Sequence, residues 1–213
     1  MTDDAQVLDE LEIRRTSVGP MDNNAYLLTC RRTGAQLLVD AADDPDRLLA
    51  LVHEGTGSLD QVVTTHRHPD HHRALAAVVA ATGASTAAGA DDADAITEAT
   101  DVPITRRLQH GDTVTFGRIA LDVIALRGHT PGSVALAYTE PGGRVLVLTG
   151  DSLFPGGVGA TKGPEAFTQL YADVVSRLFG RFADDTRIYP GHGRDTTLGA
   201  ERPQLPEWRA RGW

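Results

Sequence analysis

The chain has 213 residues, of which 41% are hydrophobic and 23% charged, and its formal net charge is −9. This length and balance predict one globular domain, residues 1–213, that is able to bury a core. The acidic charge argues against a nucleic-acid partner, because such proteins usually carry a basic stripe, and the single cysteine excludes an intramolecular disulfide.

The segments that direct proteins to membranes or out of the cell have no counterpart here. The N-terminal MTDDAQVLDE is acidic and lacks the apolar stretch of a signal peptide. No apolar run approaches the ~20 residues that a membrane helix requires. The sequence therefore predicts a cytoplasmic protein with no membrane partner.

The predicted elements mix strands with helices. Residues 11–18, 24–30 and 36–39 are apolar or β-branched runs that predict strands. Asp44 and Pro45 then begin a predicted helix over 44–54. A strand over 61–65 precedes a helix over the alanine-rich residues 70–82, and the stretch 75–90 as a whole is interpreted as helix packing.

The second half of the chain continues this mixture. A short helix is expected over 90–98, strands over 119–126, 133–138 and 143–148, a helix over 164–179, a strand over 186–189 and an irregular tail from Pro203 onward. The strands follow one another in hairpin-like runs without strict βαβ alternation. This pattern indicates an α/β protein with layered sheets and helices outside.

The strongest chemical signal is the segment Thr65-His66-Arg67-His68-Pro69-Asp70-His71-His72, which follows a predicted strand and precedes a predicted helix. His66 and His68, two residues apart, can face the same side and share a metal ion. Asp70 and His71, turned by the start of the helix, can point at a neighbouring site. Imidazole and carboxylate ligands suit zinc, iron or manganese, and the lack of thiolates argues against a closed structural zinc site.

Three glycine-bearing loops repeat one pattern further along the chain. Gly128-His129-Thr130-Pro131-Gly132, Thr149-Gly150-Asp151 and Pro190-Gly191-His192-Gly193 each place one ligand-capable side chain just after a predicted strand. A single histidine in such a turn is usually an ordinary loop residue. Three such loops behind a His-x-His-x-Asp-His segment predict a metal site.

The motifs THRHPDH, GHTPGS, TGDSLF and YPGHG, in this order, resemble the metallo-β-lactamase superfamily. The resemblance implies an αββα four-layer sandwich of two mixed β-sheets with helices outside. It implies that His66, His68 and His129 hold a first ion, that Asp70, His71 and His192 hold a second, and that Asp151 bridges them. Asp40, at the end of LLVD, would support the ligands from behind.

The same resemblance implies a hydrolase with two divalent metal ions as its cofactor, zinc being the first choice and iron or manganese the alternatives. Two ions roughly 3.5–4 Å apart can share a water and present hydroxide as the nucleophile. Asp70 and Asp151 are the residues to which a catalytic role is assigned. The expected substrate is a small molecule: a thioester, a lactone or a small ester.

Within the superfamily, GDSLFPGGVGAT resembles the glyoxalase II-like branch. Many relatives have a basic and an acidic residue where this chain reads Gly159-Ala160-Thr161-Lys162. The helical extension that supplies thiol-binding residues in full-length glyoxalase II enzymes is expected to be missing. A thiol carrier other than glutathione is therefore open. Asp151 stands where several β-lactamases have cysteine, which disfavours antibiotic hydrolysis.

Two alternatives remain. Persulfide dioxygenases resemble this sequence and use one iron, held by the equivalents of His66, His129 and Asp151. A non-catalytic metal-binding scaffold would show a damaged ligand set, whereas all seven candidate ligands are present.

The remaining candidates lie outside the predicted ligand set. Cys30 is expected to be a buried packing residue, and a homodimer is left open. His72 is expected at the helix start, facing solvent or lining the rim of the site. Three residues are candidate substrate contacts, with core packing or a solvated loop charge as the alternative: Tyr26, Phe154 and Lys162. Two histidines are expected at the surface without an assigned function: His53 and His110.

Overall fold

The computed structural model describes residues 5–212. Seven strands form one mixed sheet in chain order, antiparallel from β1 to β4 and parallel from β4 to β7. These strands are β1 (Ala5–Val7), β2 (Leu11–Val18), β3 (Asn23–Cys30), β4 (Gln36–Val39), β5 (Gln61–Thr64), β6 (Ser85–Gly89) and β7 (Arg106–Leu108).

Six further strands form a second mixed sheet in the order β15-β14-β11-β10-β9-β8, in which only β11 and β14 pair in parallel. They are β8 (Thr113–Phe116), β9 (Ile119–Ala125), β10 (Val134–Thr139), β11 (Val145–Gly150), β14 (Arg187–Pro190) and β15 (Thr196–Thr197). A small hairpin, β12 (Leu153–Phe154) with β13 (Gly157–Val158), follows β11.

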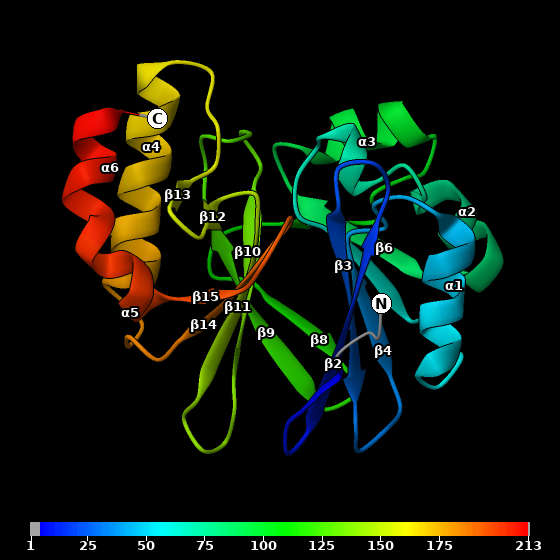
Figure 1. The fold of residues 1–213 in the computed structure, drawn as a ribbon. Coiled ribbons are helices and arrows are strands. Elements are labelled where there is room, and N and C mark those ends of the chain that lie inside the picture. The colour runs from blue at the N-terminus through cyan, green and yellow to red at the C-terminus, as the bar shows by residue number, and fades with distance from the viewer. Residues whose placement is uncertain (1–4, 213) are drawn as a thin grey trace.

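Helices cover the outer faces of both sheets (Figure 1). The helices α1 (Pro45–Glu54), α2 (Leu75–Thr82) and α3 (Ala93–Thr100) lie against the first sheet. The second sheet is covered by α4 (Pro164–Val174), a π-helical turn (Val175–Phe179), α5 (Leu198–Glu201), a 3-10 turn (Arg202–Gln204) and α6 (Leu205–Arg211). The αββα sandwich of two mixed sheets expected from the sequence is confirmed.

Three apolar layers follow from this order. Alternate side chains of the facing strands, such as Leu28, Val63, Val123 and Leu136, fill the space between the sheets. Cys30 belongs to this layer and is fully buried, as predicted. Two further layers separate each sheet from its helices. Burial on both sides fixes the sheets, so that the loops at their ends are held in place.

The alanine-rich stretch is where the helix prediction is wrong. The predicted helix over 70–82 begins only at Leu75, because Arg73 and Ala74 donate their backbone N–H groups to the loop at Ala41–Ala42. It ends at Gly83 in a left-handed conformation. The chain then forms β6, not helix, and the small residues there allow a close approach: a side chain at Gly89 would meet the Gly132 carbonyl.

The tail is the second correction. Residues from Pro203 onward were expected to be irregular, but they form α6, and Trp208 is fully buried among Phe179, Leu178 and other residues under the second sheet. Two prolines sit in the first turns of the 3-10 turn and of α6, where the missing N–H costs nothing. The burial of Trp208, which the local sequence pattern does not reveal, stabilises the helix in this segment.

Trp208→Ala should lower the free energy of unfolding by about 3–5 kcal/mol, because it removes a fully buried indole and leaves a cavity. Urea unfolding followed by far-UV circular dichroism measures this loss. Trp208→Phe is the matched variant. It should cost clearly less, since the indole Nε1 is buried without a hydrogen-bond partner within residues 5–212. Equal losses for the two variants would contradict this account of the packing.

Candidate metal centre

The candidate ligands come from both sheets and meet at one end of the sandwich. His66 and His68 follow β5, and Asp70 and His71 lie in a 3-10 turn (Pro69–His71). The others follow strands of the second sheet or link them: His129 between β9 and β10, Asp151 after β11, and His192 after β14. Because β11 and β14 run in parallel, the residues after them lie side by side, and Gly191 donates its N–H to the Gly150 carbonyl at 2.9 Å.

The first donor group consists of His66, His68 and His129. The Nε2 of His66 lies 3.0 Å from the Nδ1 of His68, which lies 2.9 Å from the Nε2 of His129. His66 is buried and the other two are half-buried. Three ring nitrogens therefore face one point, an arrangement that a cation can satisfy and that three N–H donors cannot.

The second donor group consists of Asp70, His71 and His192. The Oδ2 of Asp70 lies 3.6 Å from the Nε2 of His71 and 3.3 Å from the Nε2 of His192. His71 is fully buried. All ligand atoms of this group lie within 4.8 Å of one another. The group supplies one carboxylate and two imidazoles to a second point.

Asp151 lies between the two groups. Its Oδ1 is 3.3 Å from the Nε2 of His71, and its Oδ2 is 3.3 Å from the Nε2 of His192 and 3.7 Å from the Nε2 of His129. The Oδ1 is buried and has no well-oriented hydrogen bond within residues 5–212. A buried carboxylate oxygen left in this way is costly unless a cation satisfies it. The donor set therefore fits divalent ions.

Each of four histidines has its other ring nitrogen engaged. His71 Nδ1 lies 2.8 Å from Asp40 Oδ2, His129 Nδ1 lies 2.7 Å from the Ala160 carbonyl, and His192 Nδ1 lies 2.9 Å from the Met21 carbonyl. His66 Nδ1 is 3.1 Å from the Thr65 hydroxyl. A carbonyl or carboxylate at Nδ1 selects the tautomer whose Nε2 lone pair points inward.

The histidines of the two groups differ in proton affinity. Burial lowers the pKa of His66 well below its ordinary value, and it lowers the pKa of His68 as well. Both are therefore neutral at pH 7 and have lone pairs to offer.

In the second donor group the carboxylates reverse this effect. Burial lowers the pKa of His71, but Asp40 and Asp151 outweigh it and raise that pKa to about 10. A hydrogen bond with Asp151 raises the pKa of His192. Burial likewise raises the pKa of Asp151, but contacts with His192 and His71 outweigh it and hold that pKa well below its usual range. A cation binding there takes the place of protons, so metal binding at this group releases them.

Asp40 lies directly behind the second donor group. Besides its contact with His71, it accepts the N–H of Thr65 at 2.7 Å and the Thr65 hydroxyl at 2.8 Å. Its backbone is left-handed, with φ of 61°. One carboxylate thus orients a candidate ligand and the residue that precedes His66.

Asp92 joins the two loops that carry the first donor group. It is fully buried and accepts the N–H of Arg67, between His66 and His68, at 3.0 Å. It also accepts the Thr130 hydroxyl and, at 3.0 Å, the N–H of Gly132, which follow His129. No sequence pattern indicated this role, because Asp92 falls in the first turn of the helix predicted over 90–98, where an aspartate is common.

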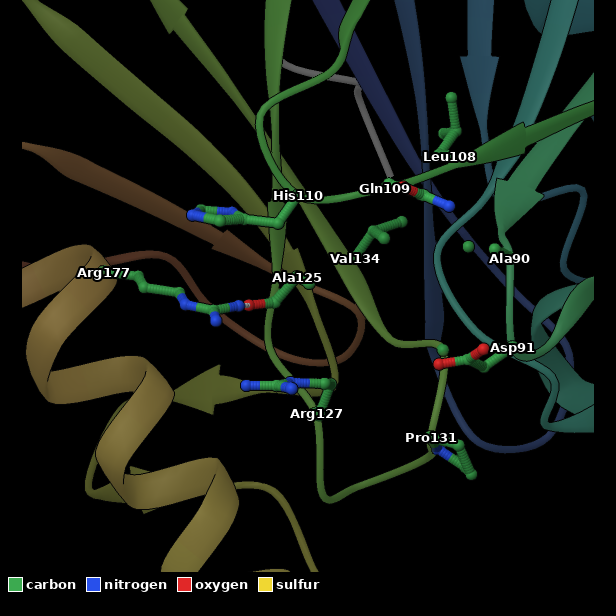
Figure 2. Close-up of a pocket in the computed structure, with 12 residues that line it drawn as sticks. Ala90, Asp91, Leu108, Gln109, His110, Ala125, Arg127, Pro131, Val134 and Arg177 are labelled. Carbon is green, nitrogen blue, oxygen red and sulfur yellow. Dashed lines mark hydrogen bonds between the residues drawn. The ribbon is translucent and has the colours of Figure 1, made fainter.

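The loop that carries His129 is also held by α4, one of the helices that cover the second sheet. Arg127 donates three hydrogen bonds of 3.0–3.1 Å to Asp173 of α4, and Figure 2 shows its side chain extending toward that helix. A cavity of about 210 Å³ lies behind the loop, lined among others by His110, Pro131 and Arg177. None of the seven candidate ligands lines it, so this cavity is separate from the metal centre.

Gly191 allows the loop after β14 to lie close to the candidate ligands Asp151 and His71. A side chain there would come within 2.2 Å of Asp151 Oδ1 and 2.7 Å of the His71 ring. The first glycine of the PGHG motif is thus required by close approach to two candidate ligands.

Other sequence predictions have mixed outcomes. His72 was expected at the surface or rim, but it is buried and its Nε2 lies 3.1 Å from the Arg67 carbonyl, so that prediction is wrong. Tyr26 is buried and donates to the Pro190 carbonyl, and is therefore no substrate contact. Phe154 lies beside His192, with ring centroids 6.4 Å apart. Lys162, His53 and His110 are exposed.

Comparison with known proteins agrees with this geometry. The model of the metallo-beta-lactamase superfamily matches residues 18–192. The hydroxyacylglutathione hydrolase of Polaromonas sp. (strain JS666) is 33% identical over 80% of this chain and 62% of its own length. The chain spans about half to three fifths of the length of the curated relatives it matches.

The chain is also similar to solved structures. TTHA1623 in a di-iron-bound form is 33% identical, with a TM-score of 0.72, over 88% of this chain and 96% of that one. ETHE1 from Myxococcus xanthus is 27% identical, with a TM-score of 0.77, over 93% and 84%.

Proposed function

The chain belongs to the metallo-β-lactamase superfamily, in its glyoxalase II-like branch, and from that premise we propose that it is a dinuclear metal-dependent hydrolase of thioesters, lactones or small esters. One observation supports this most: seven side chains with suitable donor atoms converge as two groups, with Asp151 in contact with both. We assign His66, His68 and His129 to a first ion, Asp70, His71 and His192 to a second, and Asp151 to both.

Zinc is the first choice for both ions, with iron and manganese as alternatives, because the donors are imidazole and carboxylate without thiolate. When bound, two such ions supply a Lewis acid for a carbonyl oxygen and a water of lowered pKa. The chain's own residues hold these donors in place: Asp40 and the Met21 and Ala160 carbonyls fix three imidazoles. A protein nucleophile is not needed, and Cys30 is buried between the sheets.

The substrate proposal rests on the relatives and on the rim of the site. The matched relatives are named as hydroxyacylglutathione hydrolases, which favours an acyl thioester. Met21, whose backbone carbonyl contacts His192 Nδ1, is 55% exposed, and Phe154 lies beside His192. These two side chains offer an apolar rim to an uncharged acyl portion. None of the described helices, within residues 5–212, has the length and apolar character to cross a membrane.

Separately, we propose a cytoplasmic location, with which the single cysteine agrees.

A second candidate function is oxidation of a persulfide at a single iron held by His66, His129 and Asp151. The structural likeness to ETHE1 favours it, and these three residues also lie together here. The second donor group, whose ligand atoms lie within 4.8 Å of one another, has no assigned part in that reaction, and metal content decides between the two candidates.

Elemental analysis separates these proposals. The purified protein, expressed without added metal, should carry about two equivalents of zinc, iron or manganese, and a chelator should abolish hydrolysis of a thioester and lactone panel until metal is restored. His66→Ala should lose metal and activity, whereas His53→Ala, an exposed histidine on α1, should lose neither. One equivalent of iron with oxygen uptake on a persulfide would favour the second candidate. A folded protein without metal would contradict both.

A further inference from the structure

Besides carboxylate and imidazole, an amide side chain lies against the second donor group. Asn23, the first residue of β3, is fully buried. Its Nδ2 lies 2.9 Å from Asp70 Oδ2, 3.3 Å from His192 Nε2 and 3.5 Å from His71 Nε2. The end of this amide thus contacts all three members of the group.

These separations have the dimensions expected between ligands of one ion. Ligand atoms at bond lengths of about 2.1 Å lie about 3.0–3.6 Å apart in a five-coordinate site, where neighbouring bonds meet at about 90–120°. The three Asn23 separations, 2.9–3.5 Å, and the two from Asp70, 3.3 and 3.6 Å, agree with this range. The two imidazole nitrogens lie within 4.8 Å of each other. The end of the Asn23 side chain therefore lies where a further ligand of the same ion would lie.

Backbone contacts keep Asn23 in this position. Asn23 forms a β-bridge with His192, and the N–H of Asn24 donates to the Gly191 carbonyl at 2.7 Å. The Asn24 side chain donates to the carbonyls of Pro190 and Gly193, at 3.0 Å each. The strand that carries Asn23 and the loop that carries His192 are thus fastened together.

The amide oxygen supplies the remaining chemistry. Oδ1 of Asn23 is buried and has no hydrogen-bond partner within residues 5–212. Rotating the amide about its Cβ–Cγ bond exchanges the NH2 group and the oxygen. The oxygen then faces the donor group, where an amide carbonyl is a suitable ligand for a hard cation.

We propose that Asn23 is an additional ligand of the second ion, supplying its amide oxygen, and that it sets the affinity of that site. This rests on the two-ion function proposed above. With Asn23 the second site has three oxygen ligands, from Asp70, Asp151 and Asn23, and two nitrogens, whereas the first has three nitrogens and one oxygen. Carboxylate and carbonyl oxygens suit Mn²⁺ better than imidazole nitrogens do, so Asn23 makes the second site more favourable to Mn²⁺ than the first, while zinc remains the first choice for both.

Calorimetric titration with Mn²⁺ alone tests this proposal without an activity assay. In a His68→Ala background the first donor group is incomplete, and one ion should bind at the second. Adding Asn23→Ala should raise the Kd for that ion by about 10–100-fold. Adding Asn23→Asp, which keeps an oxygen there and adds charge, should lower the Kd below that of the background. The matched control is His192→Ala, in which Asn23→Ala should leave the remaining first ion unaffected.

Three results would overturn the proposal: an unchanged Kd on adding Asn23→Ala to His68→Ala, an equal weakening in the His192→Ala background, or weaker binding with Asn23→Asp. Asn23→Asp guards against a folding defect, because a damaged fold does not tighten a site. A wild-type protein that binds no Mn²⁺ or zinc overturns the proposed function and this proposal together. Two ions in the wild type with no effect of Asn23 overturn this proposal alone.

Discussion

Asp151→Asn should reduce kcat/KM for the best thioester or lactone substrate by at least about 100-fold, more than the loss of a residue behind the ligands usually costs. Asparagine keeps the shape but removes the charge. Asp70 and Asp151 are the only carboxylates among the seven proposed ligands, so the substitution halves the negative charge that two divalent ions meet. The remaining histidines still face one another, and their lone pairs no longer have a shared anion between them.

The metal content of Asp151→Asn should fall together with its activity, because Asp151 contacts both donor groups. Elemental analysis and steady-state kinetics on the same preparation measure the two effects. Asp184→Asn is the matched control, since Asp184 is a largely exposed aspartate whose side chain pairs with Arg202 on the surface. A variant that keeps two ions and wild-type kcat/KM would show that Asp151 is not the shared ligand.

The sequence predicted which side chains come together at the candidate metal centre, because each candidate ligand sits in a local pattern. A ligand-capable residue after a strand, next to glycine, is placed at the end of a sheet by the strand alone. His129, Asp151 and His192 all follow this pattern, and the structure brings them together. The glycine is part of the signal, since Gly191 has no room for a side chain against Asp151 and His71.

Residues that act through distant contacts carried no such signal. Asp92 meets Arg67 and Thr130, 25 and 38 residues away in the chain, and Asn23 meets Asp70 across 47 residues. No periodicity or spacing reports these distances. The same limit explains α6, whose helix depends on the burial of Trp208 against the second sheet and not on local propensity.

These distant contacts matter because the two sheets supply different members of the first donor group. His66 and His68 lie in the loop that follows β5 of the first sheet, whereas His129 lies between two strands of the second sheet. The first donor group therefore forms only if the ends of two separate sheets are held in register. Asp92, which bonds to both loops, is the residue that does this most directly.

Asp92→Ala should lower the free energy of unfolding by about 3 kcal/mol, because the N–H groups of Arg67 and Gly132 lose a charged, fully buried acceptor. It should also weaken binding of the first ion by about 10–100-fold, since His68 and His129 are no longer held in register. Urea unfolding of the metal-free protein measures the first effect. Zinc titration below the unfolding transition, in the His192→Ala background, measures the second.

Asp94→Ala separates this effect from the general loss of an aspartate. Asp94 lies on α3 two residues after Asp92, but its carboxylate is exposed and pairs with Arg107 at the surface. Its removal should leave both unfolding and zinc binding as in the wild type. If Asp92→Ala unfolds at the wild-type urea concentration, or weakens the second ion while sparing the first, then the two loops are held by their strands alone and Asp92 has no part in assembling the first donor group.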